Sequence, residues 1–360
     1  MNTRLAHLLG WGLLLALAAC GTPLARSASH SSSARPAPSQ APASVPSTSP
    51  SPAPAAQPSP VQPPGPVVVV KAPNGAIAAV AADGTPLWGF DPKTLGIVEP
   101  TFVTAGPNLL AAGKGMVLVI DRTGTVIGRG VLPGDAGAGY LVPITPDPSG
   151  TRWAWLDGNS LWVAGLGESP HRVSSWTDAG VVLRQWSDAG IVITKLGPSC
   201  GQEPVSSVLV DPATGAERAL FGAHLWPLDV HGGVRVAMGP ELATIQVAGA
   251  TRFSRTLPLP VQAAGISPSA DRLFASALAM GGCGGVARAA TGVFDVATGD
   301  QATIGGFFAS AWLDDTHLVG RSVEPSPPQR VLWSSHVQVV DLSGHTSDLV
   351  LGTLVGVLHP

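Results

Sequence analysis

The sequence predicts an all-β fold, a seven-bladed β-propeller, from three observations. First, one short phrase recurs in which apolar residues lead into an Asp and a Gly follows, as in Val293–Asp300. Second, another repeat, seen in Pro143–Leu156 and Ala264–Ala277, lies about halfway between successive copies of this phrase. Third, the Gly of the phrase recurs about 43 residues apart, and a period of roughly 40–50 residues built from short strands is typical of propeller blades. The seven positions are Gly84, Gly124, Gly165, Gly215, Gly249, Gly299 and Gly344.

The repeated phrase has the composition of a hairpin turn. Clear copies are Ile120–Gly124, Val210–Gly215 and Val340–Gly344, and looser ones are Val163–Gly167 and Val247–Ala250. The Asp side chain can accept hydrogen bonds from the backbone ahead of it, and Gly adopts the positive φ that a tight hairpin needs.

The second repeat carries a resemblance to known families. Ala264–Pro268 leads through a polar turn into Arg272–Ala277, and Pro143–Pro146 leads through another into Thr151–Leu156. This pattern resembles bacterial TolB-like and WD-repeat-like propellers, whose turn between the first two strands reads like Ser-Pro-Asp-Gly, and it covers about residues 66–360. The Gly-His and Trp-Asp signatures of true WD repeats are missing, so the resemblance implies the architecture and no partner.

Composition sets further limits. The chain has 360 residues, 45% of them hydrophobic and 12% charged, with a net charge of −3. This balance gives no basic surface for nucleic acid, so we expect no nucleic-acid partner. A two-sheet β-sandwich is the alternative fold, although sandwiches show turn signals without a phased period. A ring of six or eight blades is also open.

Residues 1–19 read as a lipoprotein signal peptide. Arg4 supplies the positive start, and the apolar run Leu8–Ala19 is too short to span a bilayer comfortably. The ending Leu17–Cys20 resembles a bacterial lipobox, which implies that Cys20 is lipidated and that the protein is membrane-anchored and extracytoplasmic. An ordinary secretory signal is the alternative.

Residues 20–66 read as a disordered linker behind the anchor. Pro, Ser and Ala dominate the segment, so it offers too little apolar surface to offset the entropy of ordering. At up to ~3.1 Å per residue, it could reach on the order of 100 Å from a membrane.

Residues 67–360 read as the propeller domain. The N-terminal residues supply three strands of one blade, and we expect Leu354–Pro360 to supply its innermost strand and close the ring. We expect no helix, and alternating strands as in Arg152–Trp155. The other blades are expected at 98–137, 139–176, 180–221, 224–260, 261–305 and 307–352.

Cys200 and Cys283 are the two thiols that remain besides Cys20, and both fall in Gly-rich loops expected on one face. An exported protein lies in an oxidising compartment, so a disulfide between them is expected, with free thiols or a metal pair as alternatives. Ser199 fits a nucleophile elbow, but a β-strand follows where that motif needs a helix.

Metal and cofactor chemistry finds little support. His224, Asp229 and His231 are the densest group of potential ligands, but strand alternation separates His224 from the other two. The expected innermost strands carry no carboxylate or His, although Glu99, Asp229 and His359 could approach the central channel. We therefore expect no metal and no cofactor.

The long loops are the better candidate for a binding site. Gly197–Pro204, Ala279–Val286 and Ser322–Arg330 are expected between second and third strands, so they gather on one face. Their polar candidates are Glu203, Glu324, Gln329 and Arg330. Tolerated surface insertion is the alternative.

Together these features predict a monomeric, membrane-anchored module that binds a protein or an envelope glycan without catalysis. The rival prediction is an extracytoplasmic hydrolase or lyase that uses the central channel or the long-loop face. It requires three or more acidic or His side chains to converge. A passive spacer in the cell wall is a third interpretation.

Overall fold

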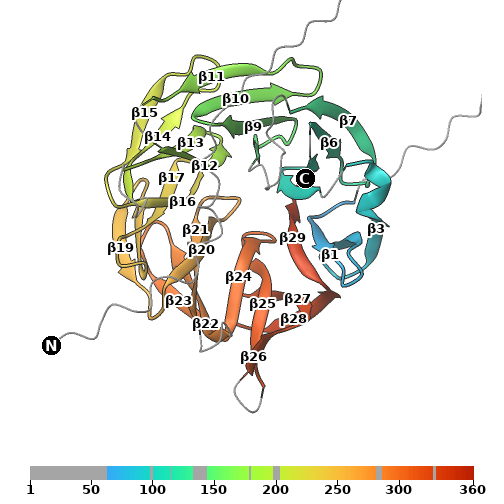
Figure 1. Ribbon diagram of the computed structural model, residues 1–360. Helices are drawn as coiled ribbons and strands as arrows, with labels where there is room; N and C mark the ends of the chain where they lie inside the picture. Colours follow the sequence, from blue (N-terminus) through green and yellow to red (C-terminus); the bar gives the residue numbers. More distant parts are fainter. Residues whose placement is uncertain are drawn as a thin grey trace, which may run out of the picture. The chain divides into compact units, whose positions relative to one another are not determined.

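Seven antiparallel sheets surround a common axis in the computed structural model (Figure 1). The structure describes residues 63–97, 100–113, 115–132, 144–177, 180–197, 203–280, 286–326 and 330–360. The predicted seven-bladed propeller is confirmed, and a two-sheet sandwich is excluded. The signal segment, Cys20 and the linker up to residue 62 lie outside the described residues.

We name the blades A to G along the ring. In each blade the strands are given from the innermost to the outermost. Blade A consists of β29 (Thr353–Leu358), β1 (Val67–Lys71), β2 (Ile77–Ala81) and β3 (Pro86–Phe90), and blade B consists of β4 (Thr101–Ala105), β5 (Asn108–Gly113), β6 (Met116–Ile120) and β7 (Val126–Val131). Blade C consists of β8 (Thr145–Pro146), β9 (Arg152–Asp157), β10 (Ser160–Gly165) and β11 (His171–Ser175), and blade D consists of β12 (Gly180–Ser187), β13 (Gly190–Leu196), β14 (Pro204–Val210) and β15 (Glu217–Phe221).

Blade E consists of β16 (Trp226–His231), β17 (Val234–Met238), β18 (Thr244–Ala248) and β19 (Arg252–Thr256), and blade F consists of β20 (Val261–Ile266), β21 (Arg272–Met280), β22 (Val286–Asp295) and β23 (Gln301–Gly305). Blade G consists of β24 (Phe307–Trp312), β25 (His317–Ser326), β27 (His336–Asp341) and β28 (Thr346–Leu351), and β26 (Arg330–Trp333) pairs with β25. The expectation of no helix was wrong in one place, because Pro92–Leu95 forms a short 3-10 helix that Asp91 caps.

The C-terminal strand closes the ring as predicted. β29 pairs antiparallel with β1 from Val67 opposite Leu358 to Lys71 opposite Thr353, so blade A combines strands from both ends of the propeller. Sheet pairing therefore replaces the open edge that β1 would otherwise present.

The repeated turns have the predicted geometry in the clear copies. Gly84, Gly124, Gly215, Gly299 and Gly344 all have positive φ. The looser copies differ: Gly165 and Gly249 do not, and blade C uses Gly167 instead, with φ 73°. In blade C the positive φ therefore lies two residues after the expected Gly, and in blade E no residue of the turn between Ala248 and Arg252 has positive φ.

The hydrophobic core is divided among the junctions between blades. Seven clusters of buried side chains correspond one to one to the seven junctions. The expected alternation along Arg152–Trp155 was wrong, because Trp153, Ala154 and Trp155 are all buried. Neighbouring blades cover both faces of a middle strand, which therefore reads as a continuous apolar run.

Hydrogen bonds also link the turns of neighbouring blades. Asn108 Nδ2 donates to the carbonyl of Ser149 at 2.9 Å, which joins blade B to blade C. The amide of Ser269 donates to Asp315 Oδ1 at 2.9 Å, which joins blade F to blade G. Each turn thus helps to fix the orientation of the next blade.

Candidate functional site

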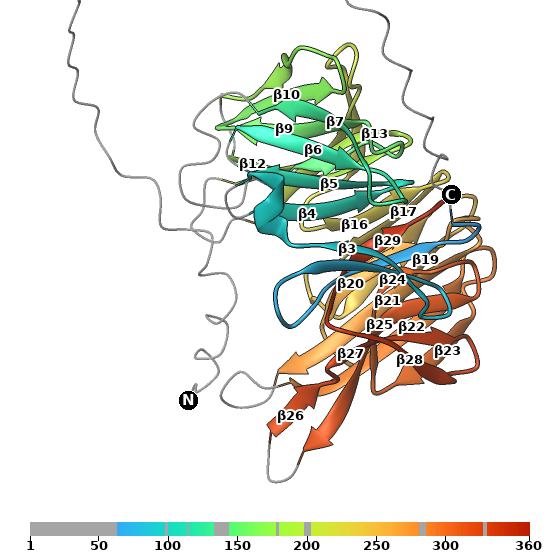
Figure 2. The ribbon, with the colours of Figure 1, turned by 90° about the vertical axis from the view of Figure 1, so that its right-hand side faces the viewer.

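Elongated hairpins lie on one face of the propeller, where the second strand of each blade is connected to the third. The predicted loop Ser322–Arg330 is instead largely strand, because β25 continues to Ser326 and pairs with β26 from Val323 opposite Trp333 to Ser326 opposite Arg330. Likewise Ala279, Met280 and Val286 lie in β21 and β22. Figure 2 shows the β25–β26 hairpin reaching beyond the body of its blade, and β26 contacts β22.

The four predicted binding residues have different outcomes. Glu203 is exposed, and its Oε2 lies 3.5 Å from Nδ1 of His224, whose φ is +63°. Glu324 and Arg330 lie in the β25–β26 hairpin, where the structure describes their backbone only. Gln329 lies outside the described residues, as do Ser199, Cys200 and Cys283. The disulfide therefore stays a prediction.

The group His224, Asp229 and His231 is not assembled into one site. His224 faces Glu203, whereas His231 Nε2 lies 3.1 Å from the carbonyl of Pro268. The Asp229 carboxylate binds backbone and amide groups. Among the described residues, no group of three or more His, Cys, Asp or Glu side chains is placed to hold a metal ion.

The junction between blades D and E differs from the other six. Its cluster contains four buried residues, Val192, Leu209, Leu220 and Val230, whereas the others contain eight to twelve among the residues described. Since apolar burial supplies most of the adhesion between packed elements, other contacts must contribute more here.

Polar contacts fill the inner part of this junction. Gln185 of β12 binds both backbone groups of Val230, accepting from its amide at 3.0 Å and donating to its carbonyl at 3.3 Å. Its Nε2 also donates to Asp229 Oδ1 at 2.7 Å. The side chain of Gln185 thus replaces the contacts that a neighbouring strand would make.

Asp229 extends this connection to a third blade. Its Oδ2 accepts from the amide of Ile266 in β20 at 2.7 Å, and its Oδ1 accepts from its own neighbour Val230 at 2.8 Å. Burial raises the pKa of the Asp229 carboxyl, although these hydrogen bonds and His231 act in the opposite direction. One carboxylate therefore joins blades D, E and F.

Two cation–aromatic contacts cross the same junction. The Arg184 guanidinium lies 4.5 Å from the ring centroid of Trp226, and Arg235 lies 5.9 Å from that of Phe221. Arg184 is exposed, yet surrounding protein desolvates it enough to lower the pKa of its guanidinium. Arg184 lies in a β-bulge of the innermost strand, because the register of β12 shifts between Leu183 and Gln185. Register shifts also occur in the innermost strands of four other blades, and the one in blade E falls between Pro227 and Asp229.

The outer part of the D–E junction is a groove of about 470 Å³. Leu220, Phe221 and Gly222 line it from blade D. Blade E contributes Arg235, Gln246, Val247, Ala248, Arg252, Phe253 and Ser254. Sequence reasoning missed this site, because its members lie on four strands and share no motif.

A larger hollow of about 780 Å³ lies at the turns of blades E and F. Its charged groups are largely engaged with neighbouring backbone. Asp295 caps its own turn by accepting from the amides of Ala297 and Thr298. Arg272 donates to the carbonyl of Asp315 at 2.9 Å. The hollow is therefore a weaker ligand site than the D–E groove.

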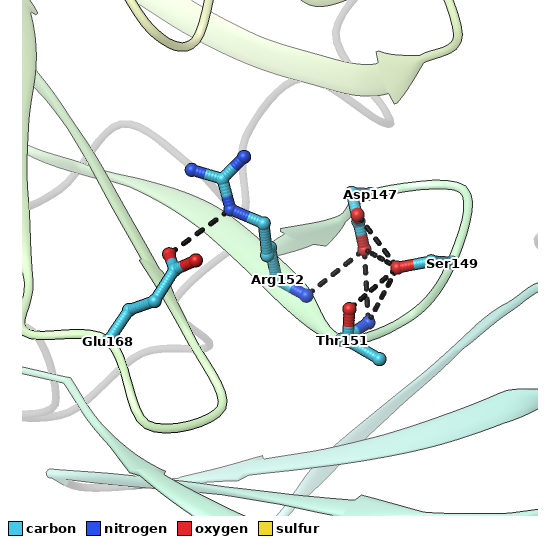
Figure 3. A network of polar contacts seen from close by, with 5 residues as sticks. All are labelled: Asp147, Ser149, Thr151, Arg152 and Glu168. Atoms are coloured by element: carbon cyan, nitrogen blue, oxygen red, sulfur yellow. Dashed lines mark hydrogen bonds and ion pairs between the residues drawn. The ribbon is translucent and has the colours of Figure 1, made fainter.

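The polar turn between β8 and β9 of blade C has a structural role (Figure 3). Asp147 Oδ1 accepts from the amides of Thr151 and Arg152 at 3.0 Å each. The Ser149 hydroxyl donates to the Asp147 carboxylate, and Arg152 Nε pairs with Glu168 Oε2 at 3.2 Å. The carboxylate is used to hold the turn.

Comparisons with known proteins agree with the fold. No protein-family model matches the sequence, and no curated protein matches it either. Similar solved structures include AztD from Citrobacter koseri, with 13% identity, a TM-score of 0.50 and coverage of 81% of this chain and 96% of that one. A putative TolB from Agrobacterium tumefaciens has 12% identity, a TM-score of 0.42 and coverage of 66% and 87%.

The WD40 domain of Neurospora crassa Pan2 has 10% identity, a TM-score of 0.44 and coverage of 77% of this chain and 85% of that one. The ring of seven antiparallel sheets confirms the expected propeller architecture. At these identities, the similarity to the solved structures concerns the fold alone.

Proposed function

We propose that this protein is a membrane-anchored extracytoplasmic lipoprotein whose propeller binds a protein or an envelope glycan without transforming it. The observation that carries the proposal is the pair of elongated hairpins, β21–β22 and β25–β26, which come into contact. Strands that extend beyond a four-stranded blade add surface without adding to the core of the ring. Such extensions on a rigid scaffold are where recognition is commonly found.

The anchor is proposed from the sequence. Small residues directly before Cys20, behind an apolar run, support lipidation of that Cys. Several acyl chains bury enough methylene groups for stable attachment, whereas one chain gives marginal binding. Among the residues that the structure describes, no helix is long and apolar enough to cross a bilayer.

Detergent partitioning of the full chain from a bacterial host tests the anchor. The wild-type chain should enter the detergent phase, and a Cys20→Ser variant should stay in the aqueous phase. Partition of both forms into the aqueous phase would contradict lipidation.

Site-specific photo-crosslinking tests the binding face. A photoreactive residue is placed at Glu324 or Arg330 in the hairpin, and a matched control is placed at Gln301 on the outer strand β23. We expect discrete adducts from the hairpin positions in intact cells and none from Gln301. Adducts from Gln301 alone, or none from either place, would contradict the proposed face.

A further inference from the structure

We propose that the outer groove of the D–E junction binds a carboxylate-bearing sugar, as found in acidic envelope glycans. The inference rests on the extracytoplasmic location of the proposed function, and it concerns a site apart from the hairpin face. It starts from the small core of this junction, which leaves the outer strands of blades D and E incompletely packed against each other.

The polar wall of the groove comes from one face of blade E. Arg235 lies opposite Ala248, which lies opposite Arg252, and Gln246 lies opposite Ser254. Residues directly opposite across antiparallel strands project to the same side, as do residues two apart along a strand. Val247 and Phe253 project to the other side, where they pack into the E–F core.

The charge of this wall is positive. Arg235 and Arg252 are its two charged residues, and no Asp or Glu is among the described residues that line the groove. Arg235 is partly engaged, since it donates to the carbonyl of Leu220 at 3.3 Å. Arg252 is exposed and has no hydrogen bond or ion pair with the side chains that the structure describes. Its planar guanidinium can bind a carboxylate through two parallel hydrogen bonds.

The remaining groups suit a sugar ring. The Gln246 amide can donate to and accept from hydroxyl groups, and the Ser254 hydroxyl, which donates to the carbonyl of Ile245, can still accept. Leu220 and Phe221 form an apolar wall opposite them. A volume of about 470 Å³ falls within the usual range for small-ligand sites.

Titration calorimetry on the full chain in mild detergent tests the proposal. The probe is a trimer of galacturonic acid, and a neutral galactose trimer is the control ligand. We expect the acidic trimer to bind and the neutral one to bind at least about tenfold more weakly, because a charged hydrogen bond of this kind changes affinity by that factor or more.

Arginine variants assign the binding to the groove. Arg252→Ala should lower the affinity for the acidic trimer by about tenfold. The affinity of Arg252→Lys should lie between those of wild type and Arg252→Ala, since Lys keeps the charge without the paired donors. Arg129→Ala is the matched control, because Arg129 is an exposed residue on the outer strand β7. It should leave binding unchanged, and circular dichroism checks the fold of each variant.

Four results would overturn the proposal. The first three are no binding of the acidic trimer, equal binding of the neutral trimer, and an equal loss of affinity in the Arg252→Ala and Arg129→Ala variants. The fourth is equal binding of a penta-glutamate peptide, since the site would then recognise charge without the sugar. None of these outcomes affects the crosslinking expected at the hairpin.

Discussion

At the scale of residues, the structure shows two opposite uses of a carboxylate. The Asp side chains of the repeated turns accept backbone hydrogen bonds at the surface, and these bonds lower the pKa of Asp83, Asp211 and Asp295. The pKa of Asp341 is lowered chiefly by the Ser343 hydroxyl, which donates to it, and then by backbone hydrogen bonds. Asp229 also accepts three hydrogen bonds, but burial between blades raises its pKa. The first group fixes local turns, and the second joins separate blades.

Asp229→Asn should destabilise the propeller by about 1–3 kcal/mol, because the amide keeps one acceptor oxygen and cannot accept from Ile266 on one side and from Gln185 and Val230 on the other. Chemical unfolding at neutral pH measures the effect. An unchanged free energy of unfolding would show that the Asp229 bridge contributes nothing to stability.

The contributions of Asp229 and Asp295 to the free energy of unfolding should depend on pH with opposite signs. Because the folded pKa of Asp229 is raised, the part of its contribution that depends on titration is greatest below the ordinary value of 3.8, and that part is lost as pH rises through the folded pKa. Asp295 has a lowered pKa, so its contribution is present above 3.8 and is lost as pH falls. The free energy of unfolding is measured for wild type, Asp229→Asn and Asp295→Asn from below to above pH 3.8. The loss of stability caused by Asp229→Asn should decrease as pH rises, whereas the loss caused by Asp295→Asn should increase. Parallel trends would contradict the assignment.

Close packing at one glycine gives a second test at this scale. A Cβ at Gly130 of β7 would lie 2.1 Å from the fully buried ring of Trp153 in blade C. Gly130→Ala should therefore cost about 1–3 kcal/mol through overpacking. Gly305→Ala is the control, since nothing lies within 4 Å of that position. Equal unfolding midpoints for the two variants would contradict the tight B–C contact.

At the scale of elements, the innermost strand β29 should determine whether the ring can close. A chain that ends at Gly352 leaves β1 without its partner and removes Val357 and Leu358 from two junction cores. We expect this truncated chain to aggregate or to unfold at much lower temperature than the full chain. A truncated chain with an unchanged calorimetric melting profile would show that closure by β29 is dispensable.

Sequence patterns predicted the strands better than their extensions. The blade ranges agree with the observed sheets because five of the blades repeat one turn chemistry, as in Asp211–Gly215, and set the period for the other two. The segment Ser322–Arg330 does not have the composition of a strand, because Pro325, Pro327 and Pro328 fall within it. Proline is accommodated at strand edges and hairpin ends, where no partner needs its missing N–H.

At the scale of the whole molecule, the sequence period reappears in the contacts between blades. The hydrogen bonds of Gln185 to Asp229 and of Gly232 to Asp188 each span 44 residues, and that of Ser269 to Asp315 spans 46. Equivalent positions of successive blades therefore touch. The period predicted the ring, but which residues meet at a junction depends on local bulges, such as the one before Gln185. For this reason the polar D–E junction and its groove could not be predicted.

We propose that the propeller is an anchored binding module with the β21–β22 and β25–β26 hairpins as its contact face. Hydrogen–deuterium exchange on the full chain, compared between native envelopes and purified protein in detergent, is the test of this face. We expect slower exchange in envelopes for these hairpins and unchanged exchange at the turns of the opposite face, such as 269–272. Equal exchange in both samples, or protection confined to those turns, would contradict it.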